Sequence, residues 1–192
     1  MTEFPMLSLP IPNDWPRSGL PGWCYHSPAL FDLERQHLFL THWQVVGHEN
    51  DVPEPGDWIS FDLLGERAVI MRGQDGVVRA FHNLCRHRGA RVVDGEAGHC
   101  KGAIVCPFHG WVYNLDGSLR GAAQPATFGT LDRKEFGLKP VEVENFHGFL
   151  FIRFHPGPQP AVADLLAPYA ADFAAYAAAD MLPSATASWE AE

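Results

Sequence analysis

Two short motifs, each pairing one cysteine with one histidine, constrain this chain more than any other feature. They are Cys85-x-His87 and Cys106-x-x-His109, and residues 88–105 separate them. Cysteines close to histidines in a reducing compartment indicate a metal site rather than a disulfide. Two cysteines and two histidines can bind one zinc ion, or a [2Fe–2S] cluster in which two histidines replace two cysteines on one iron.

The distribution of the ligands favours the cluster. A zinc finger places both cysteines on one turn and both histidines on one helix, whereas here each segment supplies one residue of each kind between β-patterned runs. Two facing loops of this type can hold a two-iron cluster from both sides. We expect Cys85 and Cys106 on one iron and His87 and His109 on the other, with a zinc-stabilised interaction domain as an alternative.

From residue 43 onward the pattern predicts a mainly β domain. Asp75-Gly76 and Asp116-Gly117 are tight-turn dipeptides typical of hairpins. Many short strands at this spacing predict an antiparallel β sandwich or barrel. The predicted strands are 43–47, 58–63, 68–71, 77–81, 103–105, 111–115, 138–143 and 149–154.

The segments on either side differ in composition. Residues 1–22 are rich in Pro and Gly and predict an extended arm, and Ser27-Pro28 predicts the start of a helix that continues to about His42. Residues 161–179 are rich in Ala, with near-helical apolar spacing that Pro168 interrupts. We divide the chain into an arm and helix (1–42), a cluster-binding β domain (43–155) and a linker with a helical tail (156–192).

Charge and hydropathy limit the partners and the location. The formal net charge of −9 argues against nucleic acid, which requires a basic surface. The N-terminus lacks a basic region followed by a long apolar run, and no stretch approaches about 20 apolar residues. We expect a cytoplasmic protein without a membrane span. The end of the chain, at 189–192, carries no terminating signal, so we expect it to be a cut within a longer protein.

The motifs resemble the N-terminal Rieske domain of Rieske non-haem iron oxygenase α subunits of the aromatic-ring-hydroxylating type. The resemblance implies a Rieske-type antiparallel β fold in which two loops bind a [2Fe–2S] cluster through Cys85, His87, Cys106 and His109. It covers most of the chain. The segments that carry it are 43–48, 53–57, 85–91, 106–113, 116–117, 137–138 and 147–151.

The resemblance also implies a set of residues around the cluster and a low reduction potential. Respiratory Rieske proteins brace the site with a disulfide, but the matching positions here are Ala90 and Phe108, and Trp111 replaces a hydrogen-bonding serine. Fewer hydrogen bonds to sulfur predict a potential of roughly −150 mV rather than +300 mV. Tyr113 matches a tyrosine that keeps one such bond. The predicted surrounding residues are Arg88, Gly89, Gly110, Trp111 and Tyr113.

The function implied by the family is electron transfer within an oxidoreductase that incorporates O₂, as a mono- or dioxygenase. A ferredoxin or flavin reductase would supply the electrons. They would pass to a mononuclear Fe(II) in a C-terminal catalytic domain that this sequence lacks, on a neighbouring subunit of a homotrimer. We assign no catalytic residue to this chain. A stand-alone Rieske ferredoxin-like carrier is the alternative, which the arm and the tail oppose. The substrate is not defined by these residues.

Several other residues could be mistaken for ligands. Asp32, His37 and His42 contain two histidines and a carboxylate, but on a helix His37 and His42 would lie about 140° apart and could not easily share a metal. Cys100 lacks a paired histidine at motif spacing, so we interpret it as a loop thiol. We interpret Cys24 as a packed apolar thiol.

Overall fold

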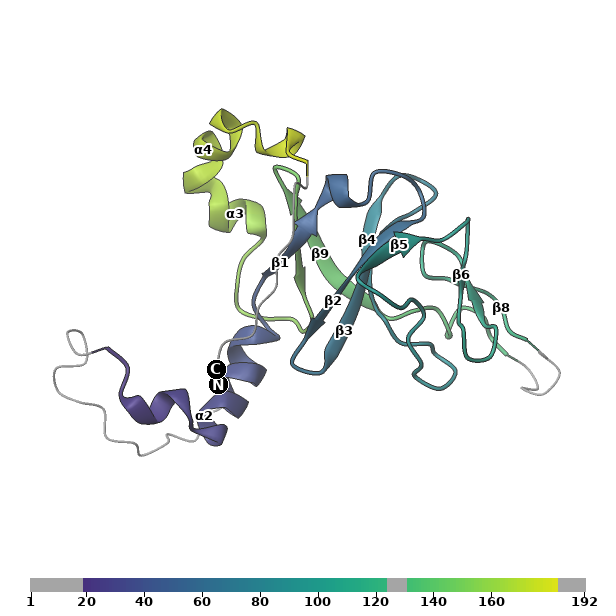
Figure 1. The fold of residues 1–192 in the computed structure, drawn as a ribbon, viewed down its shortest axis with the longest axis horizontal. Coiled ribbons are helices and arrows are strands. Elements are labelled where there is room, and N and C mark those ends of the chain that lie inside the picture. Colours follow the sequence, from purple (N-terminus) through teal and green to yellow (C-terminus); the bar gives the residue numbers. More distant parts are fainter. Residues whose placement is uncertain (1–18, 124–130, 183–192) are drawn as a thin grey trace.

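The architecture follows from the alternation of apolar side chains along short strands, which buries one or both faces of a sheet. A computed structural model describes residues 19–123 and 131–182. Seven strands form a sheet in the order β1-β10-β9-β4-β3-β2-β5, and three form a second sheet in the order β6-β7-β8 (Figure 1). All pairings are antiparallel, which confirms the predicted fold class. The strands are β1 (Gln44–His48), β2 (Asp57–Leu63), β3 (Glu66–Arg72), β4 (Val78–His82), β5 (Ala97–His99), β6 (Ile104–Val105), β7 (Val112–Tyr113), β8 (Leu119–Gly121), β9 (Pro140–Phe146) and β10 (Phe149–Arg153).

Strand β3 separates two apolar cores. Successive residues of a strand point to opposite faces of its sheet, so Ala68 and Ile70 pack into one core whereas Val69 and Met71 pack into the other. All four side chains are fully buried. The core on the Val69 side includes the two motif cysteines and the buried residues of the small sheet. The predicted ligand loops therefore pack against one face of the large sheet.

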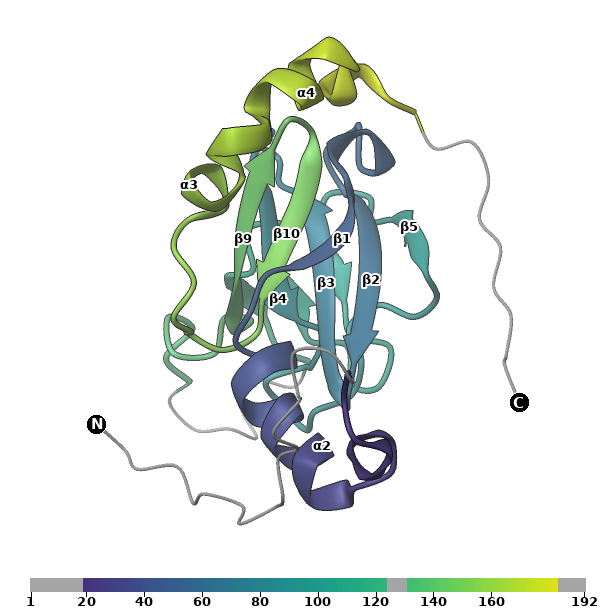
Figure 2. The same ribbon diagram turned by 90° about the vertical axis from the view of Figure 1, so that its left-hand side faces the viewer.

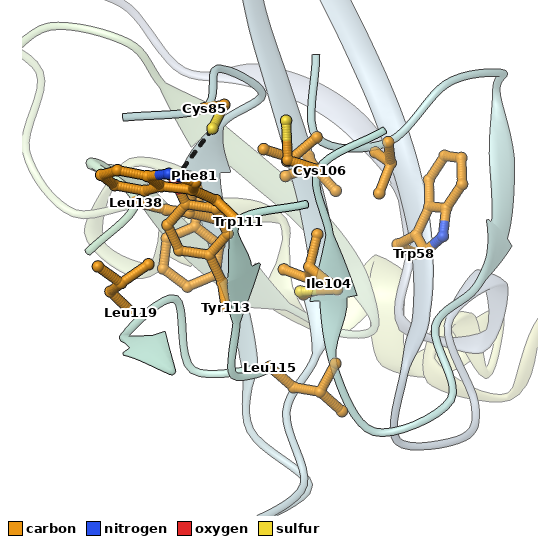
Figure 3. Close-up of a cluster of buried hydrophobic side chains, with 14 residues drawn as sticks. Trp58, Phe81, Cys85, Ile104, Cys106, Trp111, Tyr113, Leu115, Leu119 and Leu138 are labelled. Carbon is orange, nitrogen blue, oxygen red and sulfur yellow. Dashed lines mark hydrogen bonds between the residues drawn. The ribbon is translucent and has the colours of Figure 1, made fainter. Parts of the chain in front are cut away.

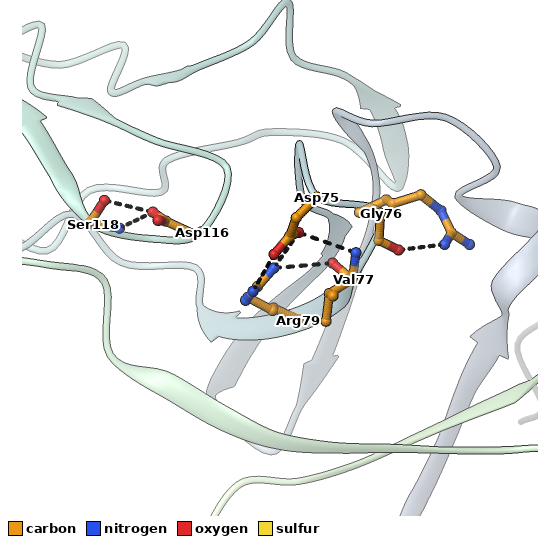
Figure 4. A network of polar contacts seen from close by, with 7 residues as sticks. Asp75, Gly76, Val77, Arg79, Asp116 and Ser118 are labelled. Carbon is orange, nitrogen blue, oxygen red and sulfur yellow. Dashed lines mark hydrogen bonds and ion pairs between the residues drawn. The ribbon is translucent and has the colours of Figure 1, made fainter.

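The two predicted tight turns each connect neighbouring strands of one sheet, the first in the large sheet and the second in the small one. Asp75-Gly76 joins β3 to β4, and Asp116-Gly117 joins β7 to β8. Gly117 has φ +83° and lies against the ring of Phe81 on β4, where a Cβ atom would be 2.4 Å from the ring. Arg79 forms an ion pair with Asp75 and also faces Asp116 across the two turns (Figure 4). Packing and charge thus hold the small sheet against β4.

Two strands were not among those predicted from the sequence. Strand β5 has three exposed residues and pairs with β2 at the sheet edge, so backbone hydrogen bonds form it without an apolar pattern. Strand β8 is a three-residue partner of β7. The strand predicted to begin at Leu138 begins at Pro140 instead, and Leu138 is a buried residue before it.

The N-terminal helix begins where the sequence predicts but changes geometry before its predicted end at His42. Helix α2 spans Pro28–Glu34, and the side chain of Ser27 caps it by accepting a hydrogen bond from the N–H of Leu30. A π-helical turn at Arg35–Phe39 follows, with the N–H of Leu40 bonded to the carbonyl of Arg35. The wider turn accompanies the burial of Leu40 in the core; none of the α2 residues is buried.

The Ala-rich tail folds into short helical segments against the β9–β10 hairpin (Figure 2). The predicted interruption at Pro168 is confirmed, because a 3₁₀ turn at Ala167–Tyr169 separates α3 (Val162–Leu166) from α4 (Ala170–Ala175). A further 3₁₀ turn at Ala178–Asp180 follows. Val162 and Phe173 pack on Phe146, Phe149 and Phe151 of the hairpin.

His48 fixes the last turn of the tail. This buried side chain accepts a hydrogen bond from the N–H of Asn50, and its other ring nitrogen lies 3.0 Å from the carbonyl oxygen of Ala178. Gly148, in the hairpin turn, leaves the space for its ring, since a Cβ there would lie 1.9 Å from Nε2 of His48. His48 and Gly148 belong to two of the segments that carry the family resemblance, 43–48 and 147–151, and these segments are therefore in contact in the fold.

The domain limits at 42 and 155 stay predictions. Most of the predicted arm (1–18) and the residues from 183 onward lie outside the described residues. The described residues include no helix with the length and apolar character that a bilayer crossing requires.

Candidate iron–sulfur centre

The two predicted ligand loops have the same backbone frame. In each, the N–H of the cysteine donates to the carbonyl five residues later, at Ala90 and at Trp111 (2.7 and 2.8 Å). The N–H of the glycine four residues after each cysteine donates back to the carbonyl of that cysteine (2.8 and 3.0 Å). These glycines have φ +69° and +66°, a backbone conformation that disfavours other residues. The pattern explains why Gly89 and Gly110 occupy equivalent positions.

Both motif cysteines are buried at the same end of the core. Cys85 and Cys106 are 4% and 2% exposed and belong to one cluster of packed side chains (Figure 3). Burial raises the pKa of the Cys85 thiol, and the neighbouring Cys106 adds to this effect. A thiolate is therefore costly here unless a cation accompanies it, which is the condition a metal ion satisfies.

Tyr113 connects one thiol to the backbone of its own loop. The hydroxyl accepts a hydrogen bond from the N–H of Arg86 at 3.0 Å and lies 3.2 Å from Sγ of Cys85. Once the N–H of Arg86 occupies the oxygen, the hydroxyl hydrogen is available to donate to sulfur (Figure 3). Burial, together with the contact with Cys85, raises the pKa of Tyr113 well above its ordinary value. The tyrosine thus stays a donor at physiological pH.

The two motif histidines lie next to each other. Their ring centroids are 4.7 Å apart, and Nδ1 of His109 is buried without a hydrogen-bond partner among the described residues. Desolvation, with the adjacent His109 and Arg88, lowers the pKa of His87 and so favours the neutral imidazole that a metal binds.

Trp111 packs beneath this pair of histidines. Its ring stacks on His87 with centroids 5.2 Å apart and an interplanar angle of 4°, and it makes a T-shaped contact with Phe136 at 5.8 Å between centroids. Trp111 is 2% exposed. Its burial and stacking support the packing role predicted for it, which stays a prediction. The side chain of Arg88 is exposed at the tip of the first loop.

Asn83 is a residue of the site that the sequence interpretation missed. Its side chain is fully buried and bridges the two ends of the first loop. The oxygen accepts hydrogen bonds from the N–H groups of Val92 and Val93 (2.9 and 3.1 Å), and the amide donates to the carbonyl of Val93 (3.0 Å). The sequence feature that could have identified this residue is an asparagine two positions before a ligand cysteine.

The donor set fits a two-iron cluster. Two buried thiols at one end and two adjacent imidazoles, one with a buried unpartnered nitrogen, match the paired ligands of a Rieske cluster. Buried polar atoms without partners are rare in proteins, so the Nδ1 of His109 indicates a missing bonding partner. Among the described residues no three His, Cys, Asp or Glu side chains converge closely enough for a single ion.

The other candidate residues lie elsewhere. Cys100 follows β5 and packs beside Trp58, and burial raises the pKa of its thiol. Cys24 lies in a 3₁₀ turn before α2. Asp32 is on α2, His37 is in the π-helical turn, and Nδ1 of His42 is 3.1 Å from the hydroxyl of Thr41.

Comparison with known proteins agrees with this geometry. Residues 42–142 match the model of the Rieske [2Fe–2S] domain family. The match covers more than half of the chain, and the chain therefore belongs to this family.

Its relatives are oxygenase subunits, which confirms the resemblance stated from the sequence. The carnitine monooxygenase oxygenase subunit of Acinetobacter baumannii is 39% identical over 128 residues, covering 67% of this chain and 34% of that protein. The glycine betaine monooxygenase oxygenase subunit of Pseudomonas aeruginosa is 38% identical over 150 residues, covering 77% and 34%. The large oxygenase component of the 2,4-dinitrotoluene dioxygenase system of a Burkholderia strain is 37% identical over 141 residues, covering 72% and 31%.

Solved structures show the same similarity. The apo form of the quaternary ammonium Rieske monooxygenase CntA superposes with a TM-score of 0.73 at 35% identity, covering 80% of this chain and 44% of that one. Naphthalene 1,2-dioxygenase superposes with a TM-score of 0.67 at 34% identity, covering 74% and 32%. The chain spans about one third of the length of the curated relatives above.

Proposed function

We propose that this chain is the electron-transfer module of a Rieske oxygenase subunit. Cys85 and Cys106 would hold one iron of a [2Fe–2S] cluster, and His87 and His109 the other. The observation that carries the proposal is the buried, unpartnered Nδ1 of His109 beside a second histidine and at the same loop tips as two buried thiols. When bound, such a cluster supplies one-electron transfer.

The surrounding residues prepare the site for this role. Tyr113 can donate a hydrogen bond to the sulfur of Cys85, and Trp111 fixes the plane of the His87 ring by stacking. Gly89 and Gly110 let both loops turn tightly around the ligand atoms. These contacts position the ligands before metal binds, which reduces the reorganisation that accompanies a change of charge.

The oxygenase relatives indicate which partners this module would have. The relatives are oxygenase subunits about three times as long as the matched region, so we propose that this module works beside a catalytic domain with a mononuclear Fe(II). A ferredoxin or flavin reductase would be the electron donor, and a neighbouring subunit of a homotrimer would be the acceptor. The overall reaction would incorporate O₂ into an organic substrate. The same relatives favour this function over that of a stand-alone ferredoxin-like carrier.

Reconstitution and a redox titration followed by EPR test the proposal. Protein refolded with iron and sulfide should take up one electron per chain and give a Rieske-type EPR signal when reduced, with a potential near the low end of the class range, roughly −150 mV. Zinc in place of iron, or a reduced protein without this signal, would contradict the proposal. A potential near the respiratory end of the range would contradict the oxygenase assignment alone.

A further inference from the structure

A recess with cationic walls lies beside the first ligand loop. It has a volume of about 420 Å³ and is lined by His82, Leu84, Cys85, Arg86, Gly89 and Lys139. Arg86 comes from the loop itself, whereas His82 ends β4 and Lys139 directly precedes β9. The N–H of His82 donates to the carbonyl of Lys139, so backbone pairing holds these two residues next to each other. Residues of both the large sheet and the first ligand loop therefore line the recess.

Arg86 and Lys139, the basic side chains of this recess, have no acidic partner among the described residues. Arg79, Arg91 and Arg153 each form an ion pair. In the part of the chain that the structure describes, Arg86 and Lys139 form no ion pair, and Nε of Arg86 is buried without a hydrogen-bond partner. Burial lowers the pKa of His82, which faces Glu66 at 3.6 Å, so the positive charges of the recess are those of Arg86 and Lys139. Arg86 lines the recess, so an acceptor from outside can pair with its guanidinium group there.

The net negative charge of the whole molecule limits the orientations in which an acidic protein can approach the recess. The chain has a formal net charge of −9, so an acidic protein is repelled from most orientations. The recess is a local exception beside a predicted cluster ligand. An arginine and a lysine match the oxygens of a carboxylate, and Arg can bind such a group through two parallel hydrogen bonds. Complementary charges of this kind fix the orientation of an encounter more than they add affinity.

We propose that this recess receives a carboxylate side chain of an acidic electron-donor protein and so orients that donor against the Cys85 loop. The inference rests on the proposed function, because it needs a cluster that accepts an electron. The donor loses one electron and the cluster gains it, with no bond formed or broken. Cys85 itself lines the recess, and the backbone N–H of Arg86 is bonded to the hydroxyl of Tyr113, which contacts Sγ of Cys85, so the docked carboxylate would lie beside the first ligand loop.

Binding of an acidic plant-type [2Fe–2S] ferredoxin to the cluster-loaded chain tests the proposal, with both proteins oxidised so that no electron moves. Isothermal titration calorimetry at low ionic strength should show binding that weakens as salt is added. Lys139→Gln should weaken binding about tenfold, and Arg86→Gln by a similar factor. Lys101→Gln makes the same change in net charge at an exposed lysine that does not line the recess, and it should leave the affinity within about twofold of the unaltered protein.

The outcomes separate this inference from the proposed function. No binding by the unaltered protein, or equal weakening by Lys101→Gln and Lys139→Gln, would overturn the inference. So would occupation of the recess by acetate that the ferredoxin does not displace, because the recess would then be a small-anion site. Iron, sulfide and EPR measurements on each variant show whether the cluster is present. Because Lys139 lies outside the ligand loop, its variant remains informative even if Arg86→Gln fails to load.

Discussion

The loop around Cys85 and the loop around Cys106 have the same internal hydrogen bonds but different external support. Side chains from outside hold the first loop: Asn83 closes its ends, and Tyr113 bonds to its backbone and its thiol. The second loop connects β6 directly to β7, so a short hairpin supports it. Equivalent ligand geometry can thus be reached with side-chain hydrogen bonds in one case and backbone pairing in the other, and the two loops should respond differently to mutation.

Removal of Asn83 should have the largest effect and should affect the first loop alone. Asn83→Ala leaves two buried N–H groups and one carbonyl without partners, which is expected to cost about 3 kcal/mol of folding free energy. Urea denaturation of the apo protein measures this difference. Asn114→Ala is the matched control in the β7–β8 turn, where the hydrogen bonds are exposed, and should cost less than about 1 kcal/mol. Similar costs for the two variants would contradict the comparison.

Removal of the Tyr113 hydroxyl should lower the reduction potential of the cluster, because this hydroxyl contacts the cysteine of the first loop only. Tyr113→Phe removes the donor to Sγ of Cys85, so the reduced cluster is stabilised less and its potential should fall. A difference of about 1 kcal/mol between oxidation states corresponds to about 40 mV for one electron. A redox titration followed by EPR measures the shift. Tyr176→Phe, at a 76% exposed position, should leave the potential unchanged. A potential that rises in Tyr113→Phe would be inconsistent with a hydroxyl donating to sulfur.

The glycines at equivalent positions of the two loops should be equally sensitive to substitution by alanine. Gly89 and Gly110 both have positive φ, and a Cβ at either position would meet no close contact. Gly89→Ala and Gly110→Ala should therefore each cost about 1 kcal/mol from backbone strain alone. Thermal denaturation of the two apo variants measures this. Costs that differ by more than twofold would show that the two backbone frames are not equivalent.

The ion pair between Asp75 and Arg79 should have the smallest effect, and only above acidic pH. The hydrogen bond from Arg79 holds the pKa of Asp75 well below its usual range. A lowered folded-state pKa means that the stabilisation is present above the unfolded pKa, about 3.9, and is lost as the pH falls toward the folded value. Asp75→Asn should lower Tm slightly at pH 7, and the difference from the unaltered protein should shrink below pH 4. A difference that grows on acidification would contradict this assignment.

The sequence was sufficient to predict the fold class and the hairpin turns. Those features depend on local signals, namely alternating apolar residues and Asp-Gly turns. The ligand assignment itself stays a prediction that the geometry supports. The predicted start of the N-terminal helix agrees with the structure, but a π-helical turn before its predicted end near His42 was not predicted; this turn accompanies the burial of Leu40, which is a tertiary effect.

Features that depend on distant contacts were not visible in the sequence. Strand β5 has only exposed residues and forms because β2 offers an unpaired edge. The role of Asn83 depends on the return of the chain at Val92, and the recess is lined by both Arg86 and Lys139, which lie more than fifty residues apart in the sequence. Such pairs have no periodicity, so only the folded chain shows them.

Mössbauer spectroscopy of the chain reconstituted with isotopically enriched iron tests the central claim most directly. Two cysteines on one iron and two histidines on the other make the irons inequivalent. The reduced protein should therefore show equal amounts of one ferric iron with sulfur ligands and one ferrous iron with nitrogen ligands. Two equivalent irons, a single mononuclear iron, or a folded protein that binds zinc in place of iron would contradict the claim that these two loops hold a Rieske cluster.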